Sequence, residues 1–302
     1  MTEVMRKLQE AASTDNGDPP VDGPVPAAPP AIETESTAFV ADGPAASDSL
    51  HDVSNFSHFA DAPVLMCDRE TVKWDAKKVH PAVIVFHERS SSISEQYRTI
   101  RARLLTLNTT QANQIIVITS AVPQEGKSVS VLNLGMVMAE NGEHRILIAD
   151  ADFRRSSIAS MVGMDDVPGL AHVLSGEAEL RDAIRPTPFP NLKILPAGRL
   201  KRKNYAELLG GSLLRSALEQ FRGAFDYTFV DTPPITTVAD VGLLAPHCDG
   251  AILVIEMRRT PEPAVQQAVR TLQTNNVKIL GTVLSRFRDH RTQYYGRYYN
   301  YY

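Results

Sequence analysis

The sequence predicts an α/β domain with a mostly parallel, doubly wound sheet and helices on both faces. Three observations predict it: short apolar runs alternate with helix-like stretches, a Gly-Lys-Ser triplet follows the first run, and aspartates end two later runs. At 302 residues and 43% hydrophobic content, the chain is long enough for one such core with additional tails.

Six short segments are β-branched and almost wholly apolar, as expected of strands that are buried on both faces of a parallel sheet. They are 114–120, 145–150, 191–198, 226–232, 250–256 and 277–285. Helical patterning lies between them, at 127–141, 204–223, 237–246 and 261–275. Pro261 is placed near the first turn of the last helix, where its missing N–H is tolerated.

The ends of the chain differ in composition from this domain. Residues 1–62 contain eleven acidic and two basic residues, and residues 13–63 are rich in Pro, Ala, Asp and Ser. Such a segment buries too little apolar surface to offset the entropy of ordering, so we expect disorder. The predicted organisation is a mostly disordered region over 1–79, the α/β domain over 80–285 and a flexible tail over 286–302. Residues 2–12 fit either a short docking helix or a frayed, solvated one.

Composition also limits the compartment. The two cysteines, Cys67 and Cys248, are too few and too isolated for a disulfide framework or a metal site, which favours a reducing cytosol. No apolar stretch approaches the roughly 20 residues of a membrane span, and the N-terminus lacks a signal pattern. We therefore expect a cytoplasmic protein that reaches a membrane only through a partner.

The first predicted strand leads into a phosphate-binding loop. A strand, then Gly126-Lys127-Ser128, then an apolar helix is typical of a P-loop, although Ala121 stands where the full G-x-x-x-x-G-K-[ST] pattern has glycine. Backbone N–H groups would hold phosphate oxygens, Lys127 would reach the β and γ phosphates, and the Ser128 hydroxyl would ligate Mg²⁺. The predicted nucleotide contacts are Gln124, Glu125, Gly126, Lys127, Ser128 and Val129.

Aspartates end two further strands. Asp150 and Asp152 follow the second strand, and Asp231 ends the fourth, just before Thr232-Pro233-Pro234. Because ligands of open α/β sheets bind beyond the carboxyl ends of the strands, the three acids should converge on the nucleotide. Asp231 has the position of a carboxylate that holds Mg²⁺ through water, whereas Asp150 and Asp152 could divide nucleophile and metal roles. Each aspartate alone could equally be a helix cap or a loop acid.

Together, the phosphate loop, the D-x-D-x-R motif and the D-T-P-P motif resemble the bacterial tyrosine kinases of capsule and exopolysaccharide assembly, of the CpsD/CapB type. The resemblance runs from about His80 to the end of the chain. It implies a P-loop NTPase fold and a protein-tyrosine autokinase that uses ATP and Mg²⁺. It also implies that Asp150 orients or deprotonates the acceptor, that Asp152 and Asp231 serve the metal, and that Arg154 organises the site or contacts a neighbouring subunit.

Two further features acquire a meaning through this resemblance. Glu95, Arg98 and Arg101 form one charged stripe on a helix and look like the family's contact between kinase subunits. The last nine residues contain six of the nine tyrosines: Tyr294, Tyr295, Tyr298, Tyr299, Tyr301 and Tyr302. In the family such a cluster is presented to the active site of the neighbouring subunit, which implies a homo-oligomer that phosphorylates in trans.

The resemblance also implies a process and a partner. It suggests exopolysaccharide or capsule biosynthesis, with recruitment to the inner face of the plasma membrane by a separate membrane activator, a polysaccharide co-polymerase.

The sequence departs from the family pattern at several positions. Gln124 replaces a glycine of P-G-E-G-K-S-T, Val129 replaces its threonine, and Ser285 stands where relatives often have an asparagine that can contact adenine. A glutamine at position 124 is strained if the loop requires positive φ there. Arg199, Lys201, Arg202 and Lys203 make one loop basic, which fits a solvated loop, an acidic activator segment or anionic lipid.

Two other classes compete with the kinase interpretation. A positioning ATPase of the ParA/MinD type shares the fold and both aspartate motifs, but it uses a second lysine where this chain has Val122. The interleaved Arg and Tyr of the tail would also suit stacking on single-stranded nucleic acid. No other basic-aromatic stripe supports that class, so we expect no nucleic-acid partner.

Overall fold

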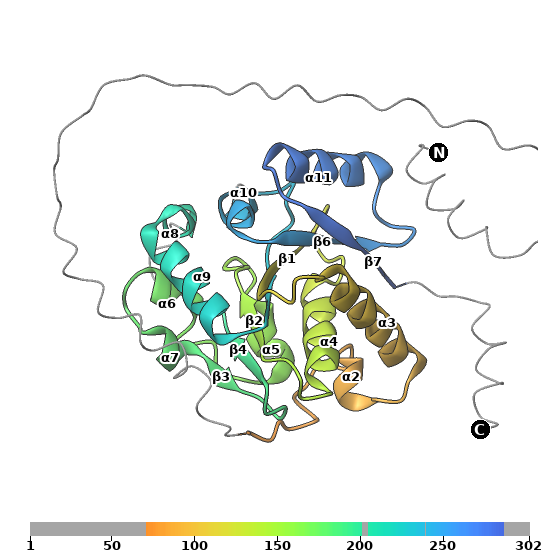
Figure 1. Cartoon of the computed structure of the whole chain (residues 1–302), viewed down its shortest axis with the longest axis vertical. Helices are drawn as coiled ribbons and strands as arrows, with labels where there is room; N and C mark the ends of the chain where they lie inside the picture. The colour runs from red at the N-terminus through yellow and green to blue at the C-terminus, as the bar shows by residue number, and fades with distance from the viewer. Residues whose placement is uncertain (1–70, 201–204, 239, 287–302) are drawn as a thin grey trace, which may run out of the picture. The chain divides into compact units, whose positions relative to one another are not determined.

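The computed structural model describes residues 71–200, 205–238 and 240–286. They form a seven-stranded sheet of order β3-β4-β2-β5-β1-β6-β7, which is parallel except for the antiparallel β3–β4 pair (Figure 1). The strands are β1 (Gln114–Ser120), β2 (Ile146–Asp150), β3 (Arg185–Pro186), β4 (Leu192–Leu195), β5 (Tyr227–Asp231), β6 (Gly250–Glu256) and β7 (Ile279–Ser285). The predicted fold class is confirmed.

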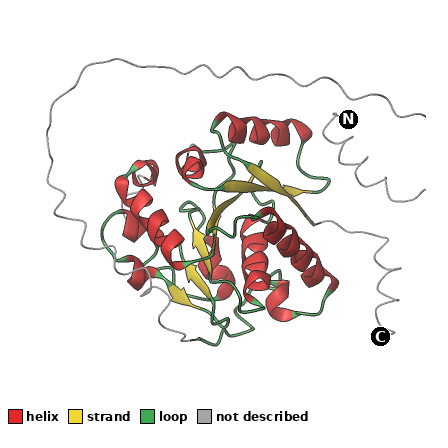
Figure 2. Cartoon of the chain, in the orientation of Figure 1, coloured by secondary structure: helices red, strands yellow, loops and turns green. Residues whose placement is uncertain are grey.

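Helices cover both faces of this sheet (Figure 2). One core cluster includes buried residues of α2 (Ile84–His87), α3 (Ser92–Leu107), α4 (Lys127–Ala139) and α5 (Ser157–Val162). The opposite core cluster includes residues of α6 (Leu170–Leu174), α7 (Leu180–Ala183), α8 (Tyr205–Gly210), α9 (Ser212–Ala224), α10 (Asp240–Leu244) and α11 (Glu262–Thr274). Alternate residues of β1 divide between the two clusters, Ile115 on one side and Ile116 on the other, as the period of a strand requires.

The centre of the sheet, from which the phosphate loop emerges, is tightly packed. Every residue of β2, β5 and β6 is buried, which explains their continuous apolar composition. On α4, Gly135 faces β2 so closely that an added Cβ would lie 2.5 Å from Ile148 Cδ1. This contact fixes α4 against the centre of the sheet, with its first residue, Lys127, directly after the loop that leaves β1.

Two predicted helices are interrupted, each for a local reason. The stretch 204–223 forms α8 and α9, which are separated at Gly211, where the backbone is extended. The stretch 237–246 forms α10 and then a short 3₁₀ helix, η2 (Ala245–His247), where Pro246 cannot donate an N–H to an α-helical bond. Pro261 is the N-cap of α11. Within the described ranges, no helix is both long and apolar enough to span a bilayer.

Candidate active site

The phosphate loop connects β1 to α4 and has two left-handed backbone positions. Gly126, the N-cap of α4, has φ +88°, and Gln124 has φ +67°. Glycine adopts this conformation freely, whereas an L-residue is strained in it by about 1–2 kcal/mol. Position 124 thus does require positive φ, and the glutamine there is strained. The loop ends where the N–H groups of α4 are unpaired and suited to an anion.

Glu125 braces the loop from within. Its carboxylate is fully buried and accepts hydrogen bonds from the backbone N–H of Val122 (2.7 Å), the backbone N–H of Glu256 (3.1 Å) and the Thr260 hydroxyl. A second brace is the Thr236 hydroxyl, which donates to the carbonyl of Ala121. The Glu125 side chain therefore holds the loop against the end of β6. A phosphate bound in the loop would contact the backbone of Glu125 and not its side chain. Val129 follows in the first turn of α4, half-buried.

The aspartates converge as predicted from the strand ends. Asp150 and Asp231 are register partners at the carboxyl ends of the paired strands β2 and β5, and both are fully buried. Asp152 lies two residues on and is 3% exposed. The backbone N–H of Ala151 donates to the carbonyl of Asp231 (2.8 Å), which ties the two strand ends together.

Asp231 faces the phosphate loop with one oxygen free. Its Oδ2 accepts from the Ser128 hydroxyl (2.5 Å), which also lies 2.7 Å from Ser157 Oγ. Its Oδ1 is buried and has no hydrogen-bond partner. Burial raises the pKa of Asp231 to about 7, although Lys127 and the Ser128 hydroxyl favour the charged form. An orphaned carboxylate oxygen beside a P-loop serine is what a bound cation would satisfy.

Asp150 is held differently. Its Oδ1 accepts from the backbone N–H of Asp152 (3.0 Å) and its Oδ2 from that of Ile158, in the first turn of α5 (3.1 Å). Burial, together with the nearby Asp231 carboxyl, raises the pKa of Asp150 well above its ordinary range. Two N–H bonds fix the orientation of this carboxyl, and each oxygen keeps a further lone pair.

The Arg154 side chain pairs with Asp240 and not with one of the three site aspartates. The half-exposed side chain forms an ion pair with Asp240 at the start of α10 (3.3 Å), while Asp152 Oδ1 accepts from the backbone N–H of Arg155 (3.2 Å). Arg154 thus joins the loop after β2 to α10.

The oxygen atoms at this site fit magnesium. In the described part of the chain, no cluster of three or more acidic, histidine or cysteine side chains is arranged as a metal cage. Magnesium does not need one, because it is usually held by one or two carboxylates, waters and substrate phosphates. The unpaired Asp231 Oδ1 and the adjacent Ser128 hydroxyl are ligands of that kind.

The predicted interface residues make contacts inside the chain. Arg98 donates through Nε and Nη2 to both carboxylate oxygens of Glu140 (2.8 and 2.7 Å), just past α4. Arg101 donates to the carbonyl of Val137 (2.6 Å) and lies 3.4 Å from Glu140. Glu95, whose side chain is 64% exposed, pairs with Arg98. The two arginines therefore fasten α3 to α4, and only the acid projects from the surface.

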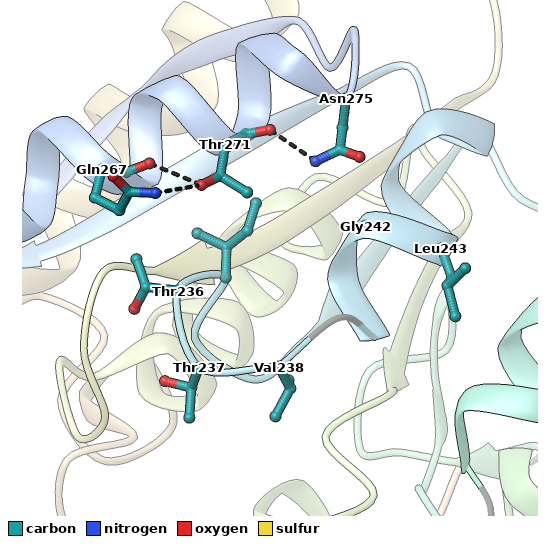
Figure 3. Close-up of a pocket in the computed structure, with 9 residues that line it drawn as sticks. Thr236, Thr237, Val238, Gly242, Leu243, Gln267, Thr271 and Asn275 are labelled. Carbon is teal, nitrogen blue, oxygen red and sulfur yellow. Dashed lines mark hydrogen bonds between the residues drawn. The ribbon is translucent and has the colours of Figure 1, made fainter.

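A pocket of about 540 Å³ lies beside this site (Figure 3). Its lining includes Thr236 and Thr237, in the loop after β5, Leu243 of α10, and Gln267 and Thr271 of α11. Its side chains are uncharged, and none belongs to the phosphate loop. It is thus separate from the predicted nucleotide contacts.

Other predicted residues lie elsewhere. The six tail tyrosines, residues 2–12 and Lys201, Arg202 and Lys203 are outside the described residues. Ser285 ends β7, and its buried hydroxyl has no hydrogen-bond partner and faces Gly126. Burial, with a smaller effect of Asp249, raises the pKa of Cys248 to about 12, which makes it unreactive.

Sequence reasoning missed the residues that brace the loop. Thr236, Glu256 and Thr260 lie more than a hundred residues from the loop that they support. Their only sequence signal is that they end or follow predicted strands, which is true of many polar residues.

The chain is similar in sequence to known families and proteins. The profile of the ParA family, described as NUBPL iron-transfer P-loop NTPase, matches residues 111–292. Tyrosine-protein kinase YwqD of Bacillus subtilis (strain 168) is 32% identical over 216 residues, which cover 72% of this chain and 90% of YwqD.

Two further similarities extend this result. The succinoglycan biosynthesis transport protein ExoP of Rhizobium meliloti (strain 1021) is 32% identical over 205 residues, 67% of this chain but only 26% of ExoP. Among solved structures, the kinase domain of Escherichia coli tyrosine kinase ETK has a TM-score of 0.64 and 26% identity, and the match covers 73% of this chain and 87% of that domain.

Proposed function

The chain belongs to the bacterial tyrosine-protein kinases, a group within the ParA family of P-loop NTPases, and from that premise we propose that it transfers the γ-phosphoryl group of ATP to tyrosines of its own tail. One observation carries the proposal. The free oxygen of Asp231 beside Ser128, with Asp150 fixed on the adjacent strand, provides one carboxylate for a metal and one for an acceptor.

The nucleotide would be held by the phosphate loop. The backbone N–H groups of Gln124 to Val129 would bind phosphate oxygens, and Lys127, 7% exposed at the start of α4, would neutralise the β and γ phosphates. Ser128, Asp231 and Asp152 would hold Mg²⁺ directly or through water. When bound, the metal neutralises charge on the phosphates during transfer.

Asp150 would serve the acceptor. In the transfer, the bond between the γ-phosphorus and the ADP oxygen breaks, a bond from the phenol oxygen to phosphorus forms, and the phenol proton goes to Asp150. The direction of the pKa shift suits this role, because a carboxylate with a raised pKa is a stronger base than an ordinary one. Arg154, tied to Asp240, would organise the loop that carries Asp152.

The tail, residues 286–302, supplies the acceptors. It contains six tyrosines with four arginines and one aspartate, so it begins near +3. Each phosphate adds about −1.5 to −2 charge, so two phosphates neutralise the tail or reverse its sign. We infer that an unmodified tail is attracted to the acidic metal site of a neighbouring copy and that a phosphorylated one leaves it, which loosens a homo-oligomer.

The proposed setting is exopolysaccharide or capsule production. YwqD is named a tyrosine-protein kinase and ExoP a succinoglycan biosynthesis transport protein; this chain spans about a quarter of ExoP. We propose a cytoplasmic chain that a separate membrane activator recruits to the membrane. We propose that the chain consists of an N-terminal region over 1–79, the kinase domain over 80–285 and the tail over 286–302.

A positioning ATPase is the second candidate, because the matching family profile is that of ParA. Against it, the loop has Val122 in place of a second lysine, and Val122 packs on the apolar core instead of offering a charge to phosphate.

Phosphotyrosine formation separates the two candidates. The full chain is incubated with Mg-ATP, with and without membranes of its native host, beside Lys127→Met and a chain that lacks 294–302. We expect phosphate steps in the intact mass of the wild type and none in either variant. ATP hydrolysis without any phosphotyrosine would favour the positioning ATPase.

A further inference from the structure

A second pocket lies at the opposite edge of the sheet from the phosphate loop. Its volume is about 690 Å³, and its walls come from the segment after α2, the end of α4 and the segment before β4. Arg145, in its wall, directly precedes β2, whereas Asp150 ends β2. Five residues of strand separate them by about 16 Å. The pocket is therefore distinct from the candidate active site.

Two guanidinium groups give this pocket a positive charge. Arg89 is exposed, lies over the ring of Phe189 at 5.2 Å, and pairs with no carboxylate among the described residues. Arg145 uses Nε and Nη2 on Asp226, while its Nη1 has no described partner and its side chain is 44% exposed. Both arginines can thus donate to an anion without breaking an existing contact.

The acid in the pocket wall is already neutralised. Both carboxylate oxygens of Glu140 are bound by Arg98, and Arg101 is also within ion-pair distance. Its charge is therefore balanced before any ligand arrives, and the pocket retains the charge of Arg89.

The remaining wall is apolar, although Phe189 is only 6% exposed and its ring lies under Arg89. Pro188, Phe189 and Pro190 follow one another directly, with Asn191 next to them. Asn191 is occupied, because its amide donates to the carbonyl of His144 (2.6 Å). Unpaired Arg89, the free Nη1 of Arg145 beside its Asp226 pair, and the apolar wall match a ligand that joins an aromatic ring to an anion.

We propose that this pocket binds a phosphorylated tyrosine from the tail of a second copy of the chain. The ring would lie against the Pro188–Pro190 wall, and the phosphate would accept from Arg89 and Arg145. The proposal rests on the proposed function, since the kinase reaction would produce this ligand. It gives the phosphorylated tail a second binding site once it has left the active site, so the loosened copies stay linked through this pocket.

The test uses the full chain, dephosphorylated and without ATP, and synthetic peptides of residues 291–302. One peptide has phosphotyrosine at Tyr298, a second has phosphoserine there, and a third is unmodified. Binding is measured by fluorescence anisotropy at physiological salt. We expect the phosphotyrosine peptide to bind at least about tenfold more tightly than the others, because only it fills both parts of the pocket.

Two variants locate the binding. Arg89→Gln should weaken the phosphotyrosine peptide about tenfold, because it removes an exposed cation without disturbing the core. Arg215→Gln, an equal charge change on exposed Arg215 of α9, should leave binding unchanged. Saturating Mg-ADP should not displace the peptide, since the phosphate loop is elsewhere.

Several results would overturn the proposal: no binding, equal affinity for phosphoserine, competition by millimolar inorganic phosphate alone, or equal losses in both variants. The peptide is phosphorylated by synthesis, so its binding does not depend on kinase activity. Failure here would leave phosphotyrosine formation standing, and a chain without kinase activity could still bind the peptide.

Discussion

Gln124, in the phosphate loop, has a strained backbone conformation. Gln124 and Gln111 both have positive φ, at +67° and +52°, but Gln111 lies between α3 and β1, far from the loop in sequence. Glycine removes the steric cost at either position, partly offset by its greater freedom in the unfolded chain. We expect Gln124→Gly to raise the free energy of unfolding by about 0.5–1 kcal/mol in urea denaturation.

Gln111→Gly is the matched control and should give a similar increase. If Gln124→Gly instead lowers the free energy of unfolding while Gln111→Gly raises it, the Gln124 side chain stabilises the loop and the strain argument fails.

The buried charge of Asp231 makes stability depend on pH. Its pKa is about 7 in the folded chain against 3.8 for an ordinary aspartate, so the folded state binds more protons between these values. Stability is thus unaffected by this group below about pH 4, falls as pH rises to 7, and stays reduced above it. Without Mg²⁺, Asp231→Asn should raise the free energy of unfolding at pH 8, by on the order of 4 kcal/mol at most, and much less at pH 5.

Urea denaturation at both pH values measures this effect. Exposed Asp165→Asn should change little at either pH. Adding Mg²⁺ should stabilise the wild type and not Asp231→Asn. A loss of stability in Asp231→Asn at pH 8 would show that the carboxylate is compensated by contacts within the chain.

At the scale of residues, the sequence predicted the aspartates better than their supports. Asp150 and Asp231 could be placed because parallel strands end at one edge, so residues 81 apart in sequence become neighbours. The N–H of Ile158 that fixes Asp150 was not predicted, because α5 has only six residues and is too short to show a helical period.

The helices α3 and α4 are joined by one carboxylate. Glu140 is 14% exposed and compensates Arg98 and Arg101, which are 22% and 18% exposed. Removing its charge leaves both arginines partly buried without a counter-charge. We expect Glu140→Gln to lower the free energy of unfolding by about 1–3 kcal/mol in urea.

Glu95→Gln is the control for this contact, because Glu95 is 64% exposed and its pair with Arg98 should contribute under about 1 kcal/mol. Equal effects of the two changes would contradict the anchoring role. A Glu140→Gln chain with unchanged stability but a smaller oligomer in light scattering would assign the stripe to contacts between copies.

Elements were predictable where they were long. β1 and β6 have the predicted bounds because each contains five consecutive β-branched or apolar residues, 115–119 and 251–255, between polar or glycine ends. β3, with two residues, and α2 and α7, with four each, are too short to show a period and were missed. Neighbouring packing, which no local pattern records, determines them.

For the whole molecule, the sheet separates two sites, of which only one could be predicted from the sequence. The phosphate loop was predicted from a contiguous motif, whereas the pocket around Arg89 is assembled from three distant segments. The tail connects the two sites in the proposed reaction cycle: as acceptor at the carboxyl edge and, once phosphorylated, as ligand at the amino edge.

Trans-phosphorylation of the tail can be measured in one mixing experiment. A Lys127→Met chain with its tail is mixed with an active chain lacking residues 294–302, in Mg-ATP and with membranes of the native host. Intact-mass spectrometry then distinguishes the two chains by size. We expect phosphate steps on the Lys127→Met chain only in the mixture. A mixture in which that chain stays unmodified, while the full wild type gains phosphotyrosine under the same conditions, would contradict trans-phosphorylation.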